Sequence, residues 1–239
     1  MTIDEIAVLG VGMHQWGKFP GKSFVDLGVD AAQKALSDSG VEWGEIEFIS
    51  GANTVRNGYP GWVSASTFAN ALGFQGCQLA SSYAACASGV TALSIARAQI
   101  LSGICDVALV VGADQVDKGM FAPVPGDRPN DVDWLRFRLM GLSNPAYFGM
   151  FARRRMALYG DTQDDFAAVK VKNSNHGAQN PNARYAKAFT IDDVNASPIV
   201  ADPLRLLEIC STSDGGAALV VSSLDYARKK GITDPVKIS

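Results

Sequence analysis

The sequence predicts an α/β fold with a largely parallel sheet. Short apolar runs alternate with longer segments in which apolar residues recur at helical spacing. The run V-A-L-V-V at 107–111 is apolar throughout, which is typical of a strand buried on both faces. Glycines follow several of the helical segments, where they end a helix. Strands that alternate with helices in this way pack in layers around a sheet.

Each element is expected from the same patterns. The expected strands are residues 6–9, 46–50, 78–82, 107–111 and the end of the motif S-D-G-G-A-A-L-V-V-S. The expected helices are 23–39, 64–72, 88–102, 145–159, 165–177 and 224–230, with Thr162 or Asp164 as the cap of the fifth. Residues 235–239 resemble the start of a further strand. We therefore expect a fragment, or one half of a larger enzyme; the alternative is a natural end at an edge strand.

Composition excludes several classes of protein. The chain has 239 residues, a net charge of -3 and a pI of about 5.4. It has no basic excess with which to neutralise a nucleic acid backbone. The acidic start M-T-I-D-E-I resembles neither a signal peptide nor a transit peptide, and no apolar run is long enough for a membrane span. We expect a cytoplasmic protein that does not bind nucleic acid and does not span a membrane.

The cysteines and histidines do not suggest a metal site. The four cysteines have no CxxC spacing, and only His14 and His176 accompany them. A structural zinc site is therefore not expected, and reduced thiols fit better than a disulfide framework. In A-V-L-G-V-G-M-H-Q-W-G the third glycine comes too late for the G-x-G-x-x-G pattern of a dinucleotide site, so a strand-to-loop turn is expected there.

Cys86 lies in Y-A-A-C-A-S-G, where an expected strand turns into an expected helix. A helix N-terminus stabilises a thiolate, and a nucleophile at such a turn resembles a nucleophile elbow. The helix behind it is rich in small residues and is expected to be central and fully buried. The alternative is a structural cysteine, as expected for Cys77 and Cys105 in their apolar surroundings. Neither histidine is near Cys86 in sequence, and His176 is expected to be solvated or hydrogen-bonded within the fold rather than catalytic.

Three further motifs leave alternatives open. The run R-R-R at 153–155 either forms a solvated helix face or attracts phosphates such as those of coenzyme A. The aromatic residues of N-P-A-Y-F, from position 144, either border an apolar ligand channel or pack in the core. The glycines of S-T-S-D-G-G either let the backbone pass close to a ligand or belong to a turn at a sheet edge. Residues 118–144 form a long excursion rich in Pro, Gly, Asp and Arg, and such loops are usually functional.

Four motifs follow one another in a distinctive order. They are Y-A-A-C-A-S-G-V-T-A-L, N-P-A-Y-F-G-M-F-A-R-R-R-M-A-L-Y-G, K-N-S-N-H-G-A-Q-N-P-N-A-R-Y and D-P-L-R-L-L-E-I-C-S-T-S-D-G-G-A-A-L-V-V. Together they resemble the sterol-carrier-protein-x type thiolases, also called lipid-transfer proteins. The resemblance covers essentially the whole chain. It is closest to the bacterial members associated with sterol side-chain breakdown.

The resemblance implies a thiolase fold. That fold has two similar α/β halves, each with a five-stranded mixed sheet, around a layer of buried helices, and it is dimeric. Residues 1–117 with 203–239 would form the N-terminal half, 118–202 an inserted loop domain, and the C-terminal half has no counterpart here. Because the family's catalytic histidine and second cysteine lie in that other half, the resemblance does not imply that this chain is active alone.

The resemblance also implies site residues. Cys86 falls on the family's nucleophilic cysteine. Tyr147, Phe148, Cys210 and Ser211 fall near positions that line the pantetheine tunnel. A coenzyme A thioester would be the substrate, with no bound cofactor or metal.

The family divides by reaction. True thiolases cleave a 3-ketoacyl-CoA through a cysteine, whereas similar aldol-lyases split a β-hydroxyacyl-CoA into a ketone and a shorter acyl-CoA. The lyases use tyrosines of the second half and bind a small OB-fold, zinc-ribbon partner. R-N-G-Y-P-G-W at 56–62 and F-A-P-V-P-G-D-R resemble the lyase branch, in which Cys86 need not be the nucleophile. We therefore expect a lyase; a thiolase that uses Cys86 and a non-catalytic acyl-CoA or lipid-binding subunit are the alternatives.

Overall fold

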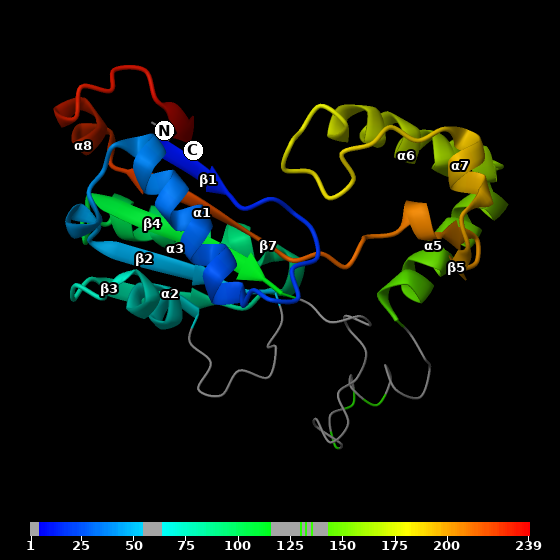
Figure 1. Ribbon diagram of the computed structural model, residues 1–239, viewed down its shortest axis with the longest axis horizontal. Coiled ribbons are helices and arrows are strands. Elements are labelled where there is room, and N and C mark those ends of the chain that lie inside the picture. Colours follow the sequence, from blue (N-terminus) through cyan, green and yellow to red (C-terminus); the bar gives the residue numbers. More distant parts are fainter. Residues whose placement is uncertain (1–4, 55–63, 116–129, 131, 133–134, 136–142) are drawn as a thin grey trace. The chain divides into compact units, whose positions relative to one another are not determined.

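The chain folds into two compact units, seen in a computed structural model (Figure 1). The described residues are 5–54, 64–115, 130, 132, 135 and 143–239. The sheet unit comprises Met1–Val116 with Ser213–Ser239, and the inserted unit comprises Asp117–Thr212. Residues 203–212, which the sequence analysis grouped with the α/β domain, belong to the inserted unit. Three stretches singled out in the sequence lie outside the described residues: R-N-G-Y-P-G-W, F-A-P-V-P-G-D-R and most of 118–144.

A six-stranded mixed sheet forms the core of the sheet unit. Its strands are β1 (Ile6–Met13), β2 (Phe48–Ala52), β3 (Gln78–Ser82), β4 (Val107–Asp114), β7 (Gly215–Ser222) and β8 (Val236–Ile238). Their spatial order is β3-β2-β4-β7-β1-β8. Strand β2 pairs in parallel with β3 and β4, whereas β7 runs antiparallel to β4 and β1, and β8 antiparallel to β1.

The expectation of a largely parallel sheet is wrong for one half of it. The parallel strands β2, β3 and β4 follow one another with helices between them, as the pattern required. Strand β7 comes after the inserted unit and enters between β4 and β1 in the opposite direction. The mixed sheet of the thiolase fold is confirmed, and β8, the strand expected at the end of the chain, is a sixth strand beyond the five expected.

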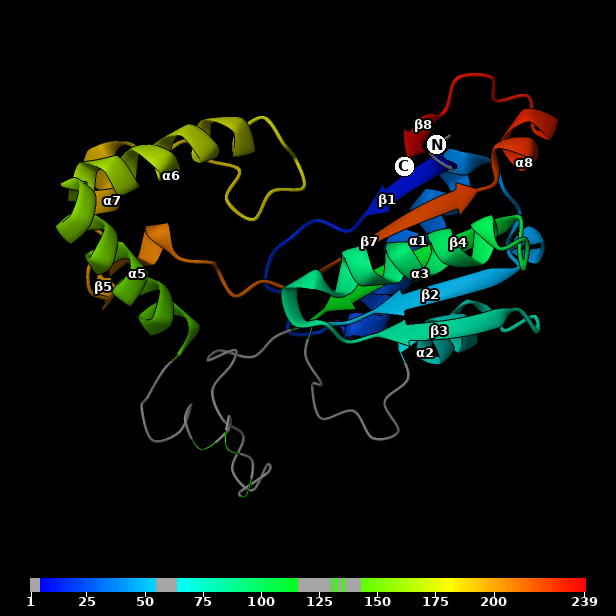
Figure 2. The same ribbon diagram turned by 180° about the vertical axis from the view of Figure 1, so that it is seen from behind.

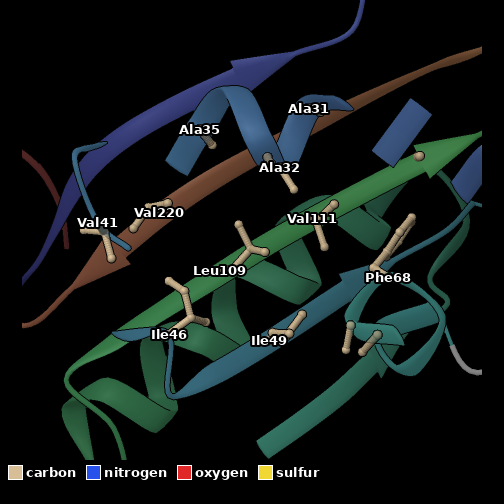
Figure 3. Packing of buried hydrophobic residues seen from close by; sticks show 14 of the residues in the cluster. Ala31, Ala32, Ala35, Val41, Ile46, Ile49, Phe68, Leu109, Val111 and Val220 are labelled. Carbon is tan, nitrogen blue, oxygen red and sulfur yellow. The ribbon is translucent and has the colours of Figure 1, made fainter. Parts of the chain in front are cut away.

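Helices cover both faces of the sheet (Figures 1 and 2). On one face lie α1 (Phe24–Ser39) and α2 (Ser64–Leu72), and α3 (Ser88–Leu101) lies on the other; α8 (Leu224–Lys229) precedes β8. Figure 3 shows the buried cluster under α1 and α2, in which Phe68 and Ala32 meet Ile49, Leu109 and Val220. A second cluster joins Ala92 and Ala96 of α3 to the opposite face.

The glycines near the N-terminus do not form the expected turn. Gly10 and Gly12 lie inside β1, and a Cβ at either position would collide with the backbone of α1 near Ala31 and Ala35. The missing side chains therefore let α1 approach the strand closely.

Helix α3 is not fully buried within the described chain, contrary to expectation. Ser88, Ala92, Ala96 and Ile100 form one buried stripe at a spacing of four residues. The opposite face is open, and Val90 is 62% exposed. A single sheet covers only one side of a helix, so small residues alone do not bury the other.

The inserted unit is mainly helical. It contains α5 (Asn144–Tyr159), α6 (Gln163–Gly177) and α7 (Ile191–Ala196), and then β5 (Ile199–Ala201) pairs with β6 (Leu204–Arg205). Thr162 is the cap of α6, one of the two expected candidates. Gly149 of α5 lies against the backbone of Ala201 and Asp202, which brings α5 close to the pair of short strands.

The described residues hold neither a candidate membrane span nor a cluster of metal ligands. None of the described helices combines the length and the apolar character needed to cross a bilayer. Within the same residues, no three or more His, Cys, Asp or Glu side chains gather where they could hold a metal ion.

Candidate functional site

Cys86 lies on a sharp turn at the carboxyl end of β3. The turn is a short 3₁₀ segment, Ala85–Ala87, which leads directly into α3. Ala85 has φ of 49°, a left-handed conformation that is rare for residues other than glycine. Such strain costs about 1–3 kcal/mol and is typical of functional sites. The Cys86 side chain is exposed, so the thiol is accessible.

Ser88 braces this turn. Its hydroxyl oxygen accepts a hydrogen bond from the backbone N–H of Ala84 at 2.8 Å. The same oxygen lies 2.7 Å from the Ala85 carbonyl and 2.9 Å from the Asn53 carbonyl, to which it can donate. Ser88 is 2% exposed, so these bonds are shielded from water. The Cys86 turn is thereby tied to the segment that follows β2.

Polar side chains gather along this edge, where the parallel strands β2, β3 and β4 all end. Asn53 Nδ2 donates to the Ala113 carbonyl at 2.6 Å, and the Thr54 N–H donates to Asp114 Oδ1 at 2.8 Å. Buried Asn53 Oδ1 and Ser82 Oγ have no hydrogen-bond partner among the described residues. Ligands of open α/β sheets bind at the carboxyl ends of the strands. This edge is therefore the candidate site of the sheet unit.

Two other cysteines and a histidine of the sheet unit are less exposed than Cys86. Cys105 is 5% exposed, and burial, with the charges of Glu47 and Asp106, raises the pKa of its thiol to about 11. Burial also raises the pKa of Cys77. His14 is buried and its ring nitrogens lie 2.7 Å from the Gln15 carbonyl and 3.0 Å from Lys22 Nζ. Among the described residues, none of these groups is hydrogen-bonded to Cys86.

A pocket of about 730 Å³ lies within the inserted unit. Helices α5 and α6, strands β5 and β6 and the segment after them supply its walls. The lining residues are Ser143, Asn144, Pro145, Phe148, Phe151, Ala152, Arg155, Phe166, Val200, Leu204, Glu208, Ile209, Cys210 and Thr212. Most of these walls are aromatic or aliphatic, as in sites for small apolar ligands.

The two charged side chains of the pocket already have partners. Arg155 forms an ion pair with Asp161. Glu208 accepts hydrogen bonds from Gln163 Nε2 at 2.7 Å and from the Arg205 N–H at 2.8 Å. Because the Arg155 charge is paired and the Glu208 carboxylate is already hydrogen-bonded within the unit, the walls favour an apolar occupant.

The sequence-predicted binding residues fall at or beside this pocket. Phe148 and Cys210 line it, and Tyr147 packs edge to face on Phe148 and Phe151, with ring centres 5.8 and 4.9 Å apart. Ser211 does not line it, although both of its neighbours do. Cys86 belongs to the other unit.

Sequence reasoning missed several other lining residues. Phe166 comes from α6, whereas Leu204 and Ile209 lie in the motif D-P-L-R-L-L-E-I-C, which was given no role for these two side chains. The structure also bears on the two alternatives for the R-R-R run at 153–155. Arg153 and Arg155 form ion pairs with Asp202 and Asp161, respectively. Their charges are thus compensated by neighbouring carboxylates. His176 is exposed, as expected.

Comparison with known proteins identifies the family. The family described as "Thiolase, N-terminal domain" matches residues 6–225 of this chain. The chain belongs to the thiolase family. Its sterol-carrier-protein-x character is supported by 30% identity over 240 residues to Sterol carrier protein 2 of Gallus gallus, which covers 94% of this chain and 42% of the relative.

Two further relatives have different activities in their names. A 17-hydroxy-3-oxo-4-pregnene-20-carboxyl-CoA lyase of Mycobacterium tuberculosis is 32% identical, over 95% of this chain and 60% of its own. An acetyl-CoA acetyltransferase of Methanothermobacter thermautotrophicus is 31% identical, over 94% and 58%. A solved structure described as an Ltp2-ChsH2(DUF35) aldolase superposes with a TM-score of 0.76 at 28% identity, over 94% and 57%. This thiolase chain thus spans 42% to 60% of the length of these proteins.

Proposed function

We propose that the chain is part of an enzyme that cleaves a carbon–carbon bond of an acyl-CoA in the breakdown of lipid or sterol side chains. The reaction is retro-aldol cleavage of a β-hydroxyacyl-CoA into a ketone and a shorter acyl-CoA. The 32% identity to the Mycobacterium tuberculosis lyase and the likeness to the Ltp2-ChsH2 aldolase support this proposal.

The pocket of the inserted unit is the structural observation that carries the proposal. Phe148 and Cys210, far apart in sequence, line one cavity in which Arg155 is ion-paired and Glu208 is hydrogen-bonded to residues of the same unit. Its size, about 730 Å³, is within the range of about 300–1,000 Å³ typical of ligand sites. Such walls suit the pantetheine arm or an apolar acyl group of a thioester.

The proposed cleavage balances without free coenzyme A. A base removes the proton of the β-hydroxyl group, and the electron pair of that O–H bond forms the ketone carbonyl. The bond between the α- and β-carbons breaks, and its electron pair passes to the α-carbon as a thioester enolate. Protonation of the α-carbon gives the shorter acyl-CoA. Cys86 forms no covalent intermediate in this reaction.

A thiolase that uses Cys86 is the second candidate. The left-handed Ala85, the exposed thiol and the position ahead of α3 favour it, because a strained turn can present a nucleophile. In that reaction the thiolate adds to the 3-keto carbon, and the bond between the α- and β-carbons breaks with its electron pair passing to the α-carbon. Protonation of the α-carbon releases the first acyl-CoA. The thiol of free coenzyme A then attacks the acyl-cysteine, takes the acyl group and returns the cysteine thiolate. The acetyl-CoA acetyltransferase among the relatives makes this candidate worth testing.

The proposed enzyme is a cytoplasmic homodimer with the second half of a thiolase fold. On the open face of α3, the Thr91 and Ser94 hydroxyls donate to the carbonyls of Ala87 and Val90 at 2.9 Å. A second layer of helices can therefore cover this face without leaving those hydroxyls unpaired. By analogy with the Ltp2-ChsH2 structure, we also propose a small OB-fold, zinc-ribbon partner.

Substitution of Cys86 by alanine separates the two reactions. In the complete protein that carries this chain, we expect Cys86→Ala to retain most of the turnover of a β-hydroxyacyl-CoA. No turnover of the β-hydroxyacyl-CoA by the unmodified protein, together with a thiolysis of a 3-ketoacyl-CoA that Cys86→Ala abolishes, would contradict the lyase and support the thiolase, because the covalent intermediate could not form.

A further inference from the structure

The chain crosses between the two units at two points that are neighbours in the sheet. It passes into the insertion at residues 116–117 and returns at 212–213. The crossings follow β4 and precede β7, and these strands are antiparallel partners, with Asp114 opposite Gly215 (Figure 1). An aspartate lies at each crossing, Asp114 at the end of β4 and Asp214 directly before β7. Both connections therefore begin in one small area beside the carboxyl end of β4.

Asp214 is held by the segment between β1 and α1. Lys18 Nζ forms an ion pair with Asp214 Oδ1 at 3.0 Å, and the Phe19 N–H donates to Oδ2 at 2.9 Å. The backbones of Gly17 and Asp214 also exchange hydrogen bonds, at 3.0 and 2.8 Å. Asp214 is 2% exposed, so its carboxylate is shielded from water. The point of return is thus fastened to another part of the sheet unit.

The motif S-T-S-D-G-G belongs to this point of return. A Cβ on Gly215 would lie 2.5 Å from an atom of the Trp16 ring, and one on Gly216 would lie 2.5 Å from the Leu27 carbonyl oxygen of α1. The two glycines therefore accommodate other parts of the sheet unit, which explains them without a ligand.

Asp114 is held in a similar way at the point of exit. The Thr54 N–H donates to Asp114 Oδ1 at 2.8 Å, and the Thr54 hydroxyl donates to Oδ2 at 2.5 Å. The preceding residue, Ala113, accepts a hydrogen bond from Asn53 Nδ2 at 2.6 Å, and Asn53 is 1% exposed. Each crossing is therefore fastened through both carboxylate oxygens of an aspartate to a different segment of the sheet unit.

The returning segment also carries the end of the pocket wall. Cys210 and Thr212 line the pocket, and Thr212 is two residues before Asp214. Two residues of extended chain span at most about 7 Å, so Thr212 cannot move far while Asp214 is fixed. A loosened Asp214 would therefore release this part of the wall.

We propose that Asp114 and Asp214 act as a double clamp at the base of the insertion, which fixes both connecting segments and holds the end of the pocket wall in place for the substrate. Lys18 and Thr54 are positioning residues, because they act through these carboxylates rather than on the substrate. The role in substrate binding rests on the proposed function, whereas the fastening of the two segments does not depend on the reaction.

Amide hydrogen exchange of the complete protein, read by mass spectrometry, tests the double clamp. Lys18→Met removes the ammonium group and leaves the buried Asp214 carboxylate without this ion pair. We expect exchange about tenfold faster at Gly17, Phe19 and Asp214, because these amides take part in the fastening. Amides in the middle of β4 and β7 should keep their protection.

The control is Lys34→Met. It removes the same charge from an ion pair with Asp30 on α1, in which both side chains are exposed. We expect no change of exchange at Gly17, Phe19 or Asp214 in this variant, since surface ion pairs contribute little.

Two further variants carry the test where Lys18→Met does not fold. In K18M/D214N the asparagine keeps an acceptor for the Phe19 N–H but carries no charge. We expect exchange at Gly17 and Phe19 to be faster than in the unmodified protein and slower than in K18M. At the other crossing, Thr54→Val keeps the shape but loses the hydroxyl, and it should raise exchange at residue 54, whereas Thr54→Ser should not.

Steady-state kinetics with a β-hydroxyacyl-CoA measure the effect on the substrate. We expect Lys18→Met, or K18M/D214N in its place, to raise KM about fivefold and to change kcat by less than about twofold, because the wall is displaced and the reacting groups are not. A purely structural loss would lower the amount of active enzyme, and hence kcat, without this rise in KM.

Each outcome decides the proposal. Unchanged exchange at Gly17, Phe19 and Asp214 in the variants would overturn it. An increase that spreads equally through β4 and β7 would also overturn it, as would an unchanged KM. Absence of turnover by the unmodified protein would overturn the proposed function instead, and the exchange measurements would still decide whether the double clamp exists.

Discussion

At the scale of single residues, the four cysteines occupy different surroundings. Cys86 and Cys210 are exposed, Cys77 is half-buried and Cys105 is buried. The thiolate is the form that reacts with electrophiles. Burial and nearby acids keep Cys105 protonated at neutral pH, because the pKa of its thiol is raised to about 11. Exposure therefore ranks Cys86 and Cys210 first in reactivity, and burial together with the raised pKa ranks Cys105 last.

Alkylation should follow this ranking. With iodoacetamide at neutral pH and mass-spectrometric readout, we expect Cys86 and Cys210 to be labelled first and Cys105 last. All four should react at comparable rates once the protein is unfolded in guanidinium chloride. Labelling of Cys105 as fast as Cys86 in the native protein would show that the described burial is incorrect.

Ser88 should matter for stability more than its size suggests. Ser88→Ala leaves the Ala84 N–H and the Asn53 carbonyl without this partner in a buried position. We expect a loss of about 1–3 kcal/mol in the free energy of unfolding, measured by denaturant titration. The control is Ser94→Ala on the open face of the same helix, where a change within about 0.5 kcal/mol is expected. Equal effects of the two substitutions would contradict the stabilisation of the Cys86 turn by the Ser88 hydrogen bonds.

Local sequence could predict the place of Cys86 but not what holds it. The strand, the turn and the helix around it are each marked by neighbouring residues. The bond from Ser88 to Asn53 joins positions 35 residues apart, and it depends on β2 and β3 lying side by side. The left-handed Ala85 carries no sequence signal, because alanine does not favour that conformation.

At the scale of elements, three helices begin with the same device. Ser23 with Asp26, Thr162 with Asp165 and Thr190 with Asp193 each form a capping box. In each box the pKa of the aspartate is lowered, mainly by the hydrogen bond from the backbone N–H of the cap residue. The ionised carboxylate therefore stabilises the start of the helix.

The contribution of these capping boxes to the free energy of unfolding should decrease in acid. Because the pKa of Asp26 is below its ordinary value of 3.8, its contribution is present above that pH and is lost as the pH falls through the lowered pKa. We expect Asp26→Asn to cost about 0.5 kcal/mol at neutral pH and to match the unmodified protein near pH 2. Thermal melts over this range test it, with Asp234→Asn as the control. A deficit that persists in acid would contradict the ionic origin.

The close packing of α1 on β1 should not tolerate a side chain at Gly12. A Cβ there would meet the backbone of α1, which cannot move aside as a flexible side chain can. We expect Gly12→Ala to destabilise the protein by about 1–3 kcal/mol in denaturant titration. Gly21→Ala is the control, since a Cβ there has no atom within 4 Å among the described residues. An unaffected Gly12→Ala would contradict the contact.

Most helices could be predicted from the sequence because their signals are local. Caps and terminal glycines stand beside the segments that they delimit, and α2 and α5 differ from expectation by at most one residue. The direction of β7 could not be predicted, because it is set by its pairing with β4 and β1 and not by its own residues. The glycines of β1 were misread as a turn because their partner, α1, lies beyond the local window.

At the scale of the whole molecule, a sheet unit is interrupted by a helical insertion. The sequence pointed to the insertion through the change in composition after β4 and to the family through four motifs. It could not predict the full pocket, because α5, α6, β5 and β6 meet there only after folding. Phe148 and Cys210 were found by resemblance, whereas Phe166 and Ile209 required the structure.

The central claim is that the enzyme carrying this chain cleaves a carbon–carbon bond by a retro-aldol reaction. The most direct test is the release of ketone from a β-hydroxyacyl-CoA by the complete protein and its partners, with and without free coenzyme A. We expect the same rate in both conditions, because the electron balance of the cleavage requires no second thiol. Product formation that appears only when free coenzyme A and a 3-ketoacyl-CoA are supplied would contradict this account and identify a thiolase.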